Sequence, residues 1–166
     1  MTAQDVLYVL DLLDKAGVTY WVGGGWGIDA LVGEQTRSHD DLDLAFPTEL
    51  ESKLIDVMWR HGFWMSSDWR PVKFVMEDEL GRSVDAHPVT FDDGTGWQAN
   101  VDGRPPFRYP REKFSEGTIE GQSVPCIGVV RQIDFHDHYE PTDKDRVDMR
   151  LLVDRFGVRL PEQYLQ

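Results

Sequence analysis

The spacing of apolar side chains divides the chain into helical and extended segments. Apolar residues that recur every three or four positions, between a capping residue and a glycine, are typical of amphipathic helices. Thr2 and Gly17 bracket the first such segment, and Gly157 ends the last. The helices predicted from this pattern span about 3–16, 26–33, 49–61, 128–138 and 142–156, with Thr48 as the cap of the third.

Other segments alternate between polar and apolar residues, or are rich in β-branched and aromatic side chains, as strands are. The predicted strands span 18–22, 41–46, 71–78 and 82–89, followed by a hairpin over 117–127 that turns at Glu120 and Gly121. Residues 90–110 are rich in Gly, Pro and Asp, which predicts a loop or an irregular strand. The chain is therefore expected to form one α/β (α+β) domain over 1–166. A mixed β-sheet flanked by helices would occupy about 1–127, and a short C-terminal helical segment about 128–166.

Two predicted strands carry carboxylates opposite an apolar face. In "DDLDLAF", residues two apart point the same way, so Asp41 and Asp43 share one face while the leucines enter the core. In "SVDAHPV", Asp85 and His87 share a face in the same manner. The Asp-x-Asp pattern alone most often marks solvent-facing residues. Asp is, however, a poor strand former, and here two strands repeat the arrangement.

If these strands are neighbours, their carboxylates meet and repel one another unless a cation lies between them. Oxygen ligands of this kind suit Mg²⁺, and three acids can hold two such ions roughly 4 Å apart at a phosphorus centre. Asp41, Asp43 and Asp85 are therefore candidate metal ligands and catalytic residues. The pattern leaves open whether Asp85 binds metal, accepts a proton from an attacking hydroxyl, or does both.

Three glycines, Gly23, Gly24 and Gly25, lie between a predicted strand and a predicted helix. Backbone amides at such a turn can bind a triphosphate, because glycine lets the chain approach the anion closely. The segment lacks the Gly-Lys-Ser/Thr part of a Walker motif and the long β-α-β alternation of a dinucleotide fold. A glycine triplet alone is as often an ordinary tight turn, so its interest lies in the acidic strand that follows.

Composition excludes several classes of protein. With 30 acidic and 17 basic residues the net charge is −13, which argues against a nucleic-acid partner and favours metal ions and cationic small molecules, although solubility alone would also explain it. The chain has a single cysteine, Cys126, no basic and apolar leader, and no apolar run of about 20 residues. These features predict a cytoplasmic protein without a membrane segment.

Three motifs taken together resemble the nucleotidyltransferase superfamily: "GGGWGIDALVG", "TRSHDDLDL" and "VDAHP". Within it the chain is most similar to the small antibiotic nucleotidyltransferases, first the lincosamide nucleotidyltransferases and next the aminoglycoside 2''-nucleotidyltransferases. The similarity to the lincosamide group continues through "GRSVDAHPVTFDDGTG", "GTIEGQSVPCI", "FHDHYEPTDKDRVDMRLLVDRFGV" and "LPEQY", so it covers nearly the whole chain.

The resemblance implies an enzyme in which a hydroxyl of a small cationic antibiotic attacks the α-phosphorus of ATP or another nucleoside triphosphate, and pyrophosphate leaves. It implies two Mg²⁺ ions as cofactors and a lincosamide as acceptor. Asp41 and Asp43 match the family's metal-binding pair, Asp85 its third carboxylate, and Gly24 and Gly25 its nucleotide-binding turn. Many superfamily members carry Gly-Ser at this turn, whereas this chain offers only backbone. A homodimer is a further expectation that rests on the resemblance alone.

Other candidates follow from charge and position. Pyrophosphate departure needs positive charge, for which Arg37 and Lys73 are candidates in nucleotide binding, with Lys144 as a third. The candidates for substrate contact are His87, Trp97 and His136. Each has an ordinary structural alternative, a surface ion pair for the cations and packing for the others.

Three other functions stay open at this point. An aminoglycoside nucleotidyltransferase would need many acids around its pocket, because its substrate is a polycation. An antitoxin-type relative would transfer the nucleotide to a protein. A non-catalytic nucleotide-binding regulator is the third, and the full set of three acids speaks against it.

Overall fold

A mixed sheet forms the centre of the computed structural model, which describes residues 1–110 and 113–165. Within these residues the sheet has nine strands, in the order β3-β4-β5-β2-β1-β9-β8, with β6 paired to β5 and β7 to β6. The pairs β2–β5 and β1–β9 are parallel and the others antiparallel, as the prediction of a mixed sheet requires. The strands are β1 (Trp21–Val22), β2 (Leu42–Pro47), β3 (Trp64–Trp69), β4 (Lys73–Glu77), β5 (Ser83–Asp92), β6 (Thr95–Gln98), β7 (Phe107–Pro110), β8 (Phe114–Ile119) and β9 (Gln122–Ile127).

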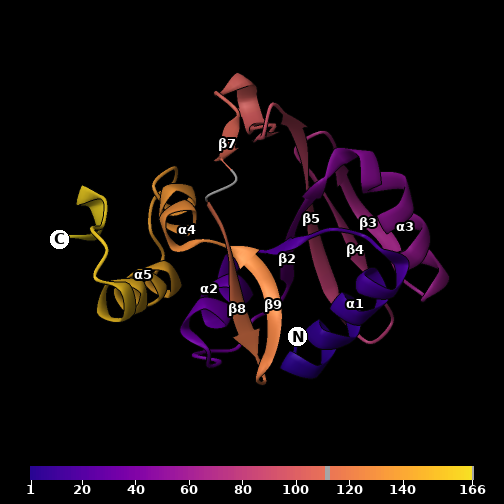
Figure 1. The fold of residues 1–166 in the computed structure, drawn as a ribbon, viewed down its shortest axis with the longest axis horizontal. Coiled ribbons are helices and arrows are strands. Elements are labelled where there is room, and N and C mark those ends of the chain that lie inside the picture. The colour runs from indigo at the N-terminus through magenta and orange to yellow at the C-terminus, as the bar shows by residue number, and fades with distance from the viewer. Residues whose placement is uncertain (111–112, 166) are drawn as a thin grey trace.

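Helices α1 and α3 lie on one side of the molecule and α4 and α5 on the other (Figure 1), and α2 packs against α4 and α5. The helices are α1 (Ala3–Ala16), α2 (Gly24–Val32), α3 (Glu51–Arg60), α4 (Val129–His136) and α5 (Asp143–Phe156). Thr2 and Thr142 cap α1 and α5 through capping boxes, and Gly17 and Gly157 end them in the left-handed conformation, which confirms the predicted ends of α1. In the part of the chain that the structure describes, no helix has the length and apolar character to cross a bilayer.

Two predictions about local structure were wrong. Thr48 does not cap α3, because residues Thr48–Leu50 form a 3-10 turn and Leu50 occupies the cap position without a side-chain hydrogen bond. The predicted strand over 18–22 is reduced to the two residues of β1, since only these pair with β2 and β9.

Two regions formed strands that the pattern did not reveal. Strand β3 is an edge strand of mostly exposed residues with an irregularity between Met65 and Ser67, so it shows no regular alternation. Residues 90–110, predicted as loop or irregular strand, form the end of β5 and the two short strands β6 and β7. These strands extend the sheet on the side where β7 lies in Figure 1.

The main core fixes which way the acidic strand faces. It lies between the sheet and the helices α1 and α3, and it includes Val6, Val9, Leu13, Leu54, Met58, Leu42, Leu44 and Phe46. The last three, all fully buried, confirm that alternate residues of β2 enter the core. Strand alternation therefore turns Asp43 to the opposite face of the sheet.

The helical segment after β9 is fastened to the rest of the domain by apolar packing and one buried ion pair. Apolar side chains of α2, α4 and α5 form a separate cluster, made of Ile28, Val32, Ile133, Met149 and Leu152. Arg37 Nη2 lies 2.7 Å from Asp148 Oδ2 and its Nε lies 3.1 Å from Oδ1, and the Asp148 side chain is only 2% exposed. Arg37 therefore joins the segment before β2 to α5.

This buried pair predicts a large loss of stability when the arginine is removed. Arg37→Met leaves the carboxylate of Asp148 buried without its guanidinium, which costs about 3 kcal/mol of unfolding free energy. Thermal denaturation should show a melting temperature lower by roughly 6–12 °C.

The matched control is Arg155→Met, because Arg155 pairs with Glu34 at an exposed position where both side chains are more than half accessible. This change should cost at most about 1 kcal/mol. An Arg37→Met protein that melts with the wild type would contradict the structural role of this arginine.

Candidate active site

The two acidic strands are neighbours, and their aspartates face each other. Strands β2 and β5 pair in parallel, with Asp43 directly opposite Asp85. Because paired residues in such a ladder point to the same face, the two carboxylates come together. One oxygen of each and one ring nitrogen of His87 all lie within 4.8 Å of one another. The Asp43–Asp85 part of the predicted geometry is therefore present, while Asp41 is not a member of this group of ligand atoms.

Asp41 precedes β2 and lines the same cavity as Asp43. Partial removal of its carboxyl from water raises the pKa of Asp41, and the neighbouring charges of Asp43 and then Asp85 raise it further. The residue is nevertheless exposed, so a cation from solution can reach its carboxylate. The oxygen-rich donor set of Asp41, Asp43 and Asp85 fits a hard divalent ion such as Mg²⁺.

Two neighbouring side chains favour the ionised form of Asp43. Burial alone would raise its pKa, but a hydrogen bond with His87 (Nε2–Oδ1, 3.1 Å) and the nearby ammonium of Lys73 outweigh it, and the pKa of Asp43 is lowered overall. Lys73 itself forms an ion pair with Asp85 and lies 5.5 Å from the ring of Trp69. Both neighbours therefore favour the charged form of Asp43, which is the form that binds a metal ion.

The glycine turn contacts the acidic strand directly. Gly24 has φ +53°, and a Cβ on it would overlap Oδ2 of Asp43, while a Cβ on Gly25 would overlap the ring of His39. The Gly23 amide donates to the Asp43 carbonyl at 2.9 Å, which ties the start of α2 to β2. Glycine is thus required at position 24 for two reasons, the left-handed backbone and the lack of space.

A cavity of about 560 Å³ opens in front of this arrangement. One side consists of the glycine turn with Asp41 and Asp43. The other side is built by β7 and the helical segment, and it is rich in aromatic rings: Phe107, Tyr109, Phe135, His136, His138 and Tyr139. A volume of this size is typical of a small-molecule site.

The predicted cationic residues lie at or near the cavity, but each of them is paired with a carboxylate. Arg37 lines the cavity while its guanidinium is bound to Asp148. Lys144 also lines it and lies 3.4 Å from Asp40. Lys73, paired with Asp85, lies beside the acids on the side of β4.

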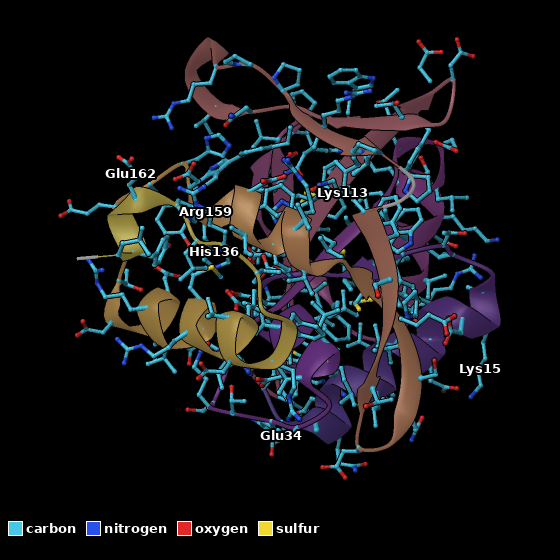
Figure 2. The ribbon with its side chains drawn as sticks, turned by 60° about the vertical axis from the view of Figure 1, so that its left-hand side comes forward. Lys15, Glu34, Lys113, His136, Arg159 and Glu162 are labelled. Atoms are coloured by element: carbon cyan, nitrogen blue, oxygen red, sulfur yellow. The ribbon has the colours of Figure 1, made fainter. Side chains whose placement is uncertain are left out.

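Of the three residues predicted to contact the substrate, two line the cavity and one does not. His136 lines the cavity and is 8% exposed; its Nδ1 bonds the Gln132 carbonyl at 2.7 Å, and its own carbonyl accepts hydrogen bonds from the C-terminal segment that lies beside it in Figure 2. His87 lines the cavity and contacts Asp43. Trp97 does not line it: on β6 it is exposed, with Arg108 over its ring, and strand alternation turns the next residue, Gln98, to the cavity instead.

Sequence reasoning missed several residues of this cavity. Gln98 and Tyr109 lie on β6 and β7, in the region predicted as loop, so no face could be assigned to them. Arg131, which packs behind lining residues and is not one of them, was also missed. It is buried beneath the aromatic side, with its guanidinium 4.2 Å from the ring centroid of Phe135, and burial lowers its pKa. Alternation within "TGWQ" and "FRYP" is the one signal that could have found the first two.

Comparisons with known proteins agree with the geometry. The sequence profile of the family described as aminoglycoside-2''-adenylyltransferase matches residues 5–152. A lincosamide resistance protein of Staphylococcus haemolyticus is 34% identical over 153 residues, which are 92% of this chain and 94% of that protein.

Solved structures show the same fold. The lincosamide antibiotic adenylyltransferase LnuA with lincomycin bound superposes with a TM-score of 0.82 at 34% identity, over 92% of this chain and 96% of that one. ANT(2'')-Ia in complex with adenylyl-2''-tobramycin gives a TM-score of 0.73 at 27% identity, over 94% and 91%. With its paired aspartates and glycine turn, the chain belongs to the aminoglycoside-2''-adenylyltransferase family of nucleotidyltransferases.

Proposed function

We propose that this protein transfers AMP from ATP to a hydroxyl of a lincosamide-type antibiotic, with Mg²⁺ as cofactor, in the cytoplasm. The observation that carries the proposal is the register of β2 and β5, which pairs Asp43 with Asp85 beside a glycine turn whose backbone approaches the same carboxylate. Charge stabilisation and positioning at phosphorus are what such a reaction needs from the protein.

Each group at the site has a role that its position supports. The amides at the start of α2 bind the triphosphate, since Gly23 precedes the helix without any side-chain cap. Asp41, Asp43 and Asp85 would hold the metal ions, which would neutralise phosphate charge and stabilise the attacking and leaving oxygens. Asp85 also accepts the proton of the attacking hydroxyl. As the acceptor oxygen bonds to the α-phosphorus, the bond to the leaving pyrophosphate breaks.

The part of the cavity that would hold the antibiotic suits a substrate with one amine and apolar surface better than a polycation. Among the described lining residues there, Asp40 pairs with Lys144, and Asp145 is engaged by the Thr142 hydroxyl and by the hydroxyl of Tyr139. An aminoglycoside would present several ammonium groups to these two acids. A lincosamide would present one, and its apolar parts could lie on the aromatic rings. The name of the similar Staphylococcus protein agrees with this choice.

The first test is an incubation of the purified protein with ATP, MgCl₂ and a panel of lincosamides and aminoglycosides, followed by mass spectrometry. The expected product is a lincosamide with one added adenylyl group, together with pyrophosphate. Addition to an aminoglycoside alone would replace the proposed acceptor. Addition to a protein, or nucleotide binding without any transfer, would reject the proposal.

Removing one metal-binding charge should abolish turnover without unfolding the protein. Asp43→Asn is expected to lower kcat by roughly a thousandfold or more, since metal-assisted charge stabilisation contributes several kcal/mol. Asp154→Asn, at an exposed position of α5, is the matched control and should retain wild-type kcat. Equal rates in the two variants would contradict the metal assignment.

A methyl group at the turn should block the site sterically. Gly24→Ala forces a Cβ onto Asp43 Oδ2 in addition to straining a backbone at φ +53°, so adenylyl transfer should fall below detection. Gly157→Ala imposes a similar strain at φ +63° in open space, at a cost of roughly 1–2 kcal/mol, and should leave kcat unchanged. Kinetics and melting temperatures of both variants separate the steric effect from strain.

A further inference from the structure

A chain of hydrogen bonds runs from the buried Tyr109 to Asp43 across four strands. The Tyr109 hydroxyl on β7 bonds Gln98 Oε1 on β6. Gln98 Nε2 lies 3.1 Å from His87 Nδ1 on β5, and His87 Nε2 lies 3.1 Å from Asp43 Oδ1 on β2. Tyr109 and Gln98 are 1% and 5% exposed, so this chain is built into the wall of the cavity.

The donors in this series of hydrogen bonds all point the same way, and the buried Tyr109 determines which way. Burial raises the pKa of Tyr109, so the hydroxyl keeps its hydrogen. Within residues 1–110 and 113–165, Gln98 Oε1 is the acceptor for that hydrogen. The amide of Gln98 is thereby oriented with its N–H groups toward the ring of His87.

The orientation of the amide decides where the imidazole carries its hydrogen. An N–H of Gln98 can bond Nδ1 of His87 only if Nδ1 presents its lone pair. The ring hydrogen then lies on Nε2, the nitrogen that faces the acceptor oxygen of Asp43. Every link of the chain then has one donor and one acceptor, and Asp43 accepts the last hydrogen bond.

We propose that Tyr109 and Gln98 act through His87 as positioning residues that keep this imidazole a donor to Asp43 and out of the metal's coordination sphere. The proposal rests on the proposed function, in which Asp43 binds Mg²⁺. Three side chains present ligand atoms within 4.8 Å here, and one is an imidazole. With its Nε2 lone pair unavailable, the aspartates alone coordinate, which favours Mg²⁺ over ions such as Zn²⁺ that bind imidazole well.

A spectroscopic test reads the tautomer directly. In protein labelled with ¹⁵N-histidine, the His87 signal, assigned by its loss in His87→Asn, should show a protonated Nε2 and an unprotonated Nδ1, both without metal and with MgCl₂. Tyr109→Phe removes one oxygen and keeps the ring packing, and it should shift the signal toward a mixture of tautomers. Gln98→Leu should do so more completely. Trp97→Leu, on the same strand but the opposite face, should leave the signal unchanged.

Metal binding supplies a second readout that a purely structural role would not change. Titration calorimetry with ZnCl₂ and MgCl₂, in the absence of substrates, should show that Gln98→Leu raises the ratio of Zn²⁺ to Mg²⁺ affinity by about tenfold or more. The double variant Gln98→Leu/His87→Asn should lose this gain, because the gain comes from the freed imidazole. Trp97→Leu should keep the wild-type ratio.

The outcomes separate this proposal from the proposed function. A wild-type His87 with its hydrogen on Nδ1, or Tyr109→Phe and Gln98→Leu proteins with the wild-type tautomer and metal ratio, would overturn the positioning role even if antibiotic transfer proceeds. Conversely, the expected tautomer and metal ratios in a protein that adenylylates nothing would reject the proposed function alone.

Discussion

The parallel pairing of β2 with β5 is the constraint on which the site depends. Because side chains alternate along a strand, a slip of one residue would turn Asp43 into the core and bring Leu42 or Leu44 to the cavity. The buried leucines oppose such a slip, since they fill the space against α1 and α3. The apolar half of "DLDL" therefore holds the register that brings the acidic half opposite Asp85.

The same register positions the glycine turn. Strand β1 pairs with the other edge of β2, and Gly23 bonds the carbonyl of Asp43, so the chain enters α2 directly in front of this carboxylate. The closeness that excludes a Cβ at Gly24 brings backbone amides and the aspartate to one spot without any intervening side chain. One strand thus aligns a carboxylate neighbour on one edge and an anion-binding turn on the other.

The sequence was sufficient for features that depend on local periodicity. Alternation in "DDLDLAF" and "SVDAHPV" predicted the acidic face, and capping residues predicted both ends of α1. Features set by distant contacts were not predictable in this way. Strand β3 exists because β4 offers it an edge, and the facing of Gln98 and Tyr109 depends on the pairing of β6 and β7 with β5. Arg37 was predicted from charge alone, and no local pattern indicates that Asp148, more than 100 positions away, occupies its guanidinium.

The charges at the cavity explain why the proposed reaction would depend on metal ions and backbone amides. A triphosphate brings several negative charges to a site that already holds Asp41, Asp43 and Asp85. Most of the nearby cations already form ion pairs with other carboxylates. Lys73 pairs with Asp85, Arg37 with Asp148, and Lys144 with Asp40. Arg104 is the lining guanidinium that forms no ion pair within residues 1–110 and 113–165.

One such arginine, at an exposed position, cannot offset the three aspartates and a triphosphate together. Divalent ions between the carboxylates and the phosphates convert this repulsion into attraction, and the amides of the glycine turn add partial positive charge without a side chain. A turn that offers backbone alone is therefore sufficient here, because the acids that repel the nucleotide are the same groups that would bind the ions to hold it.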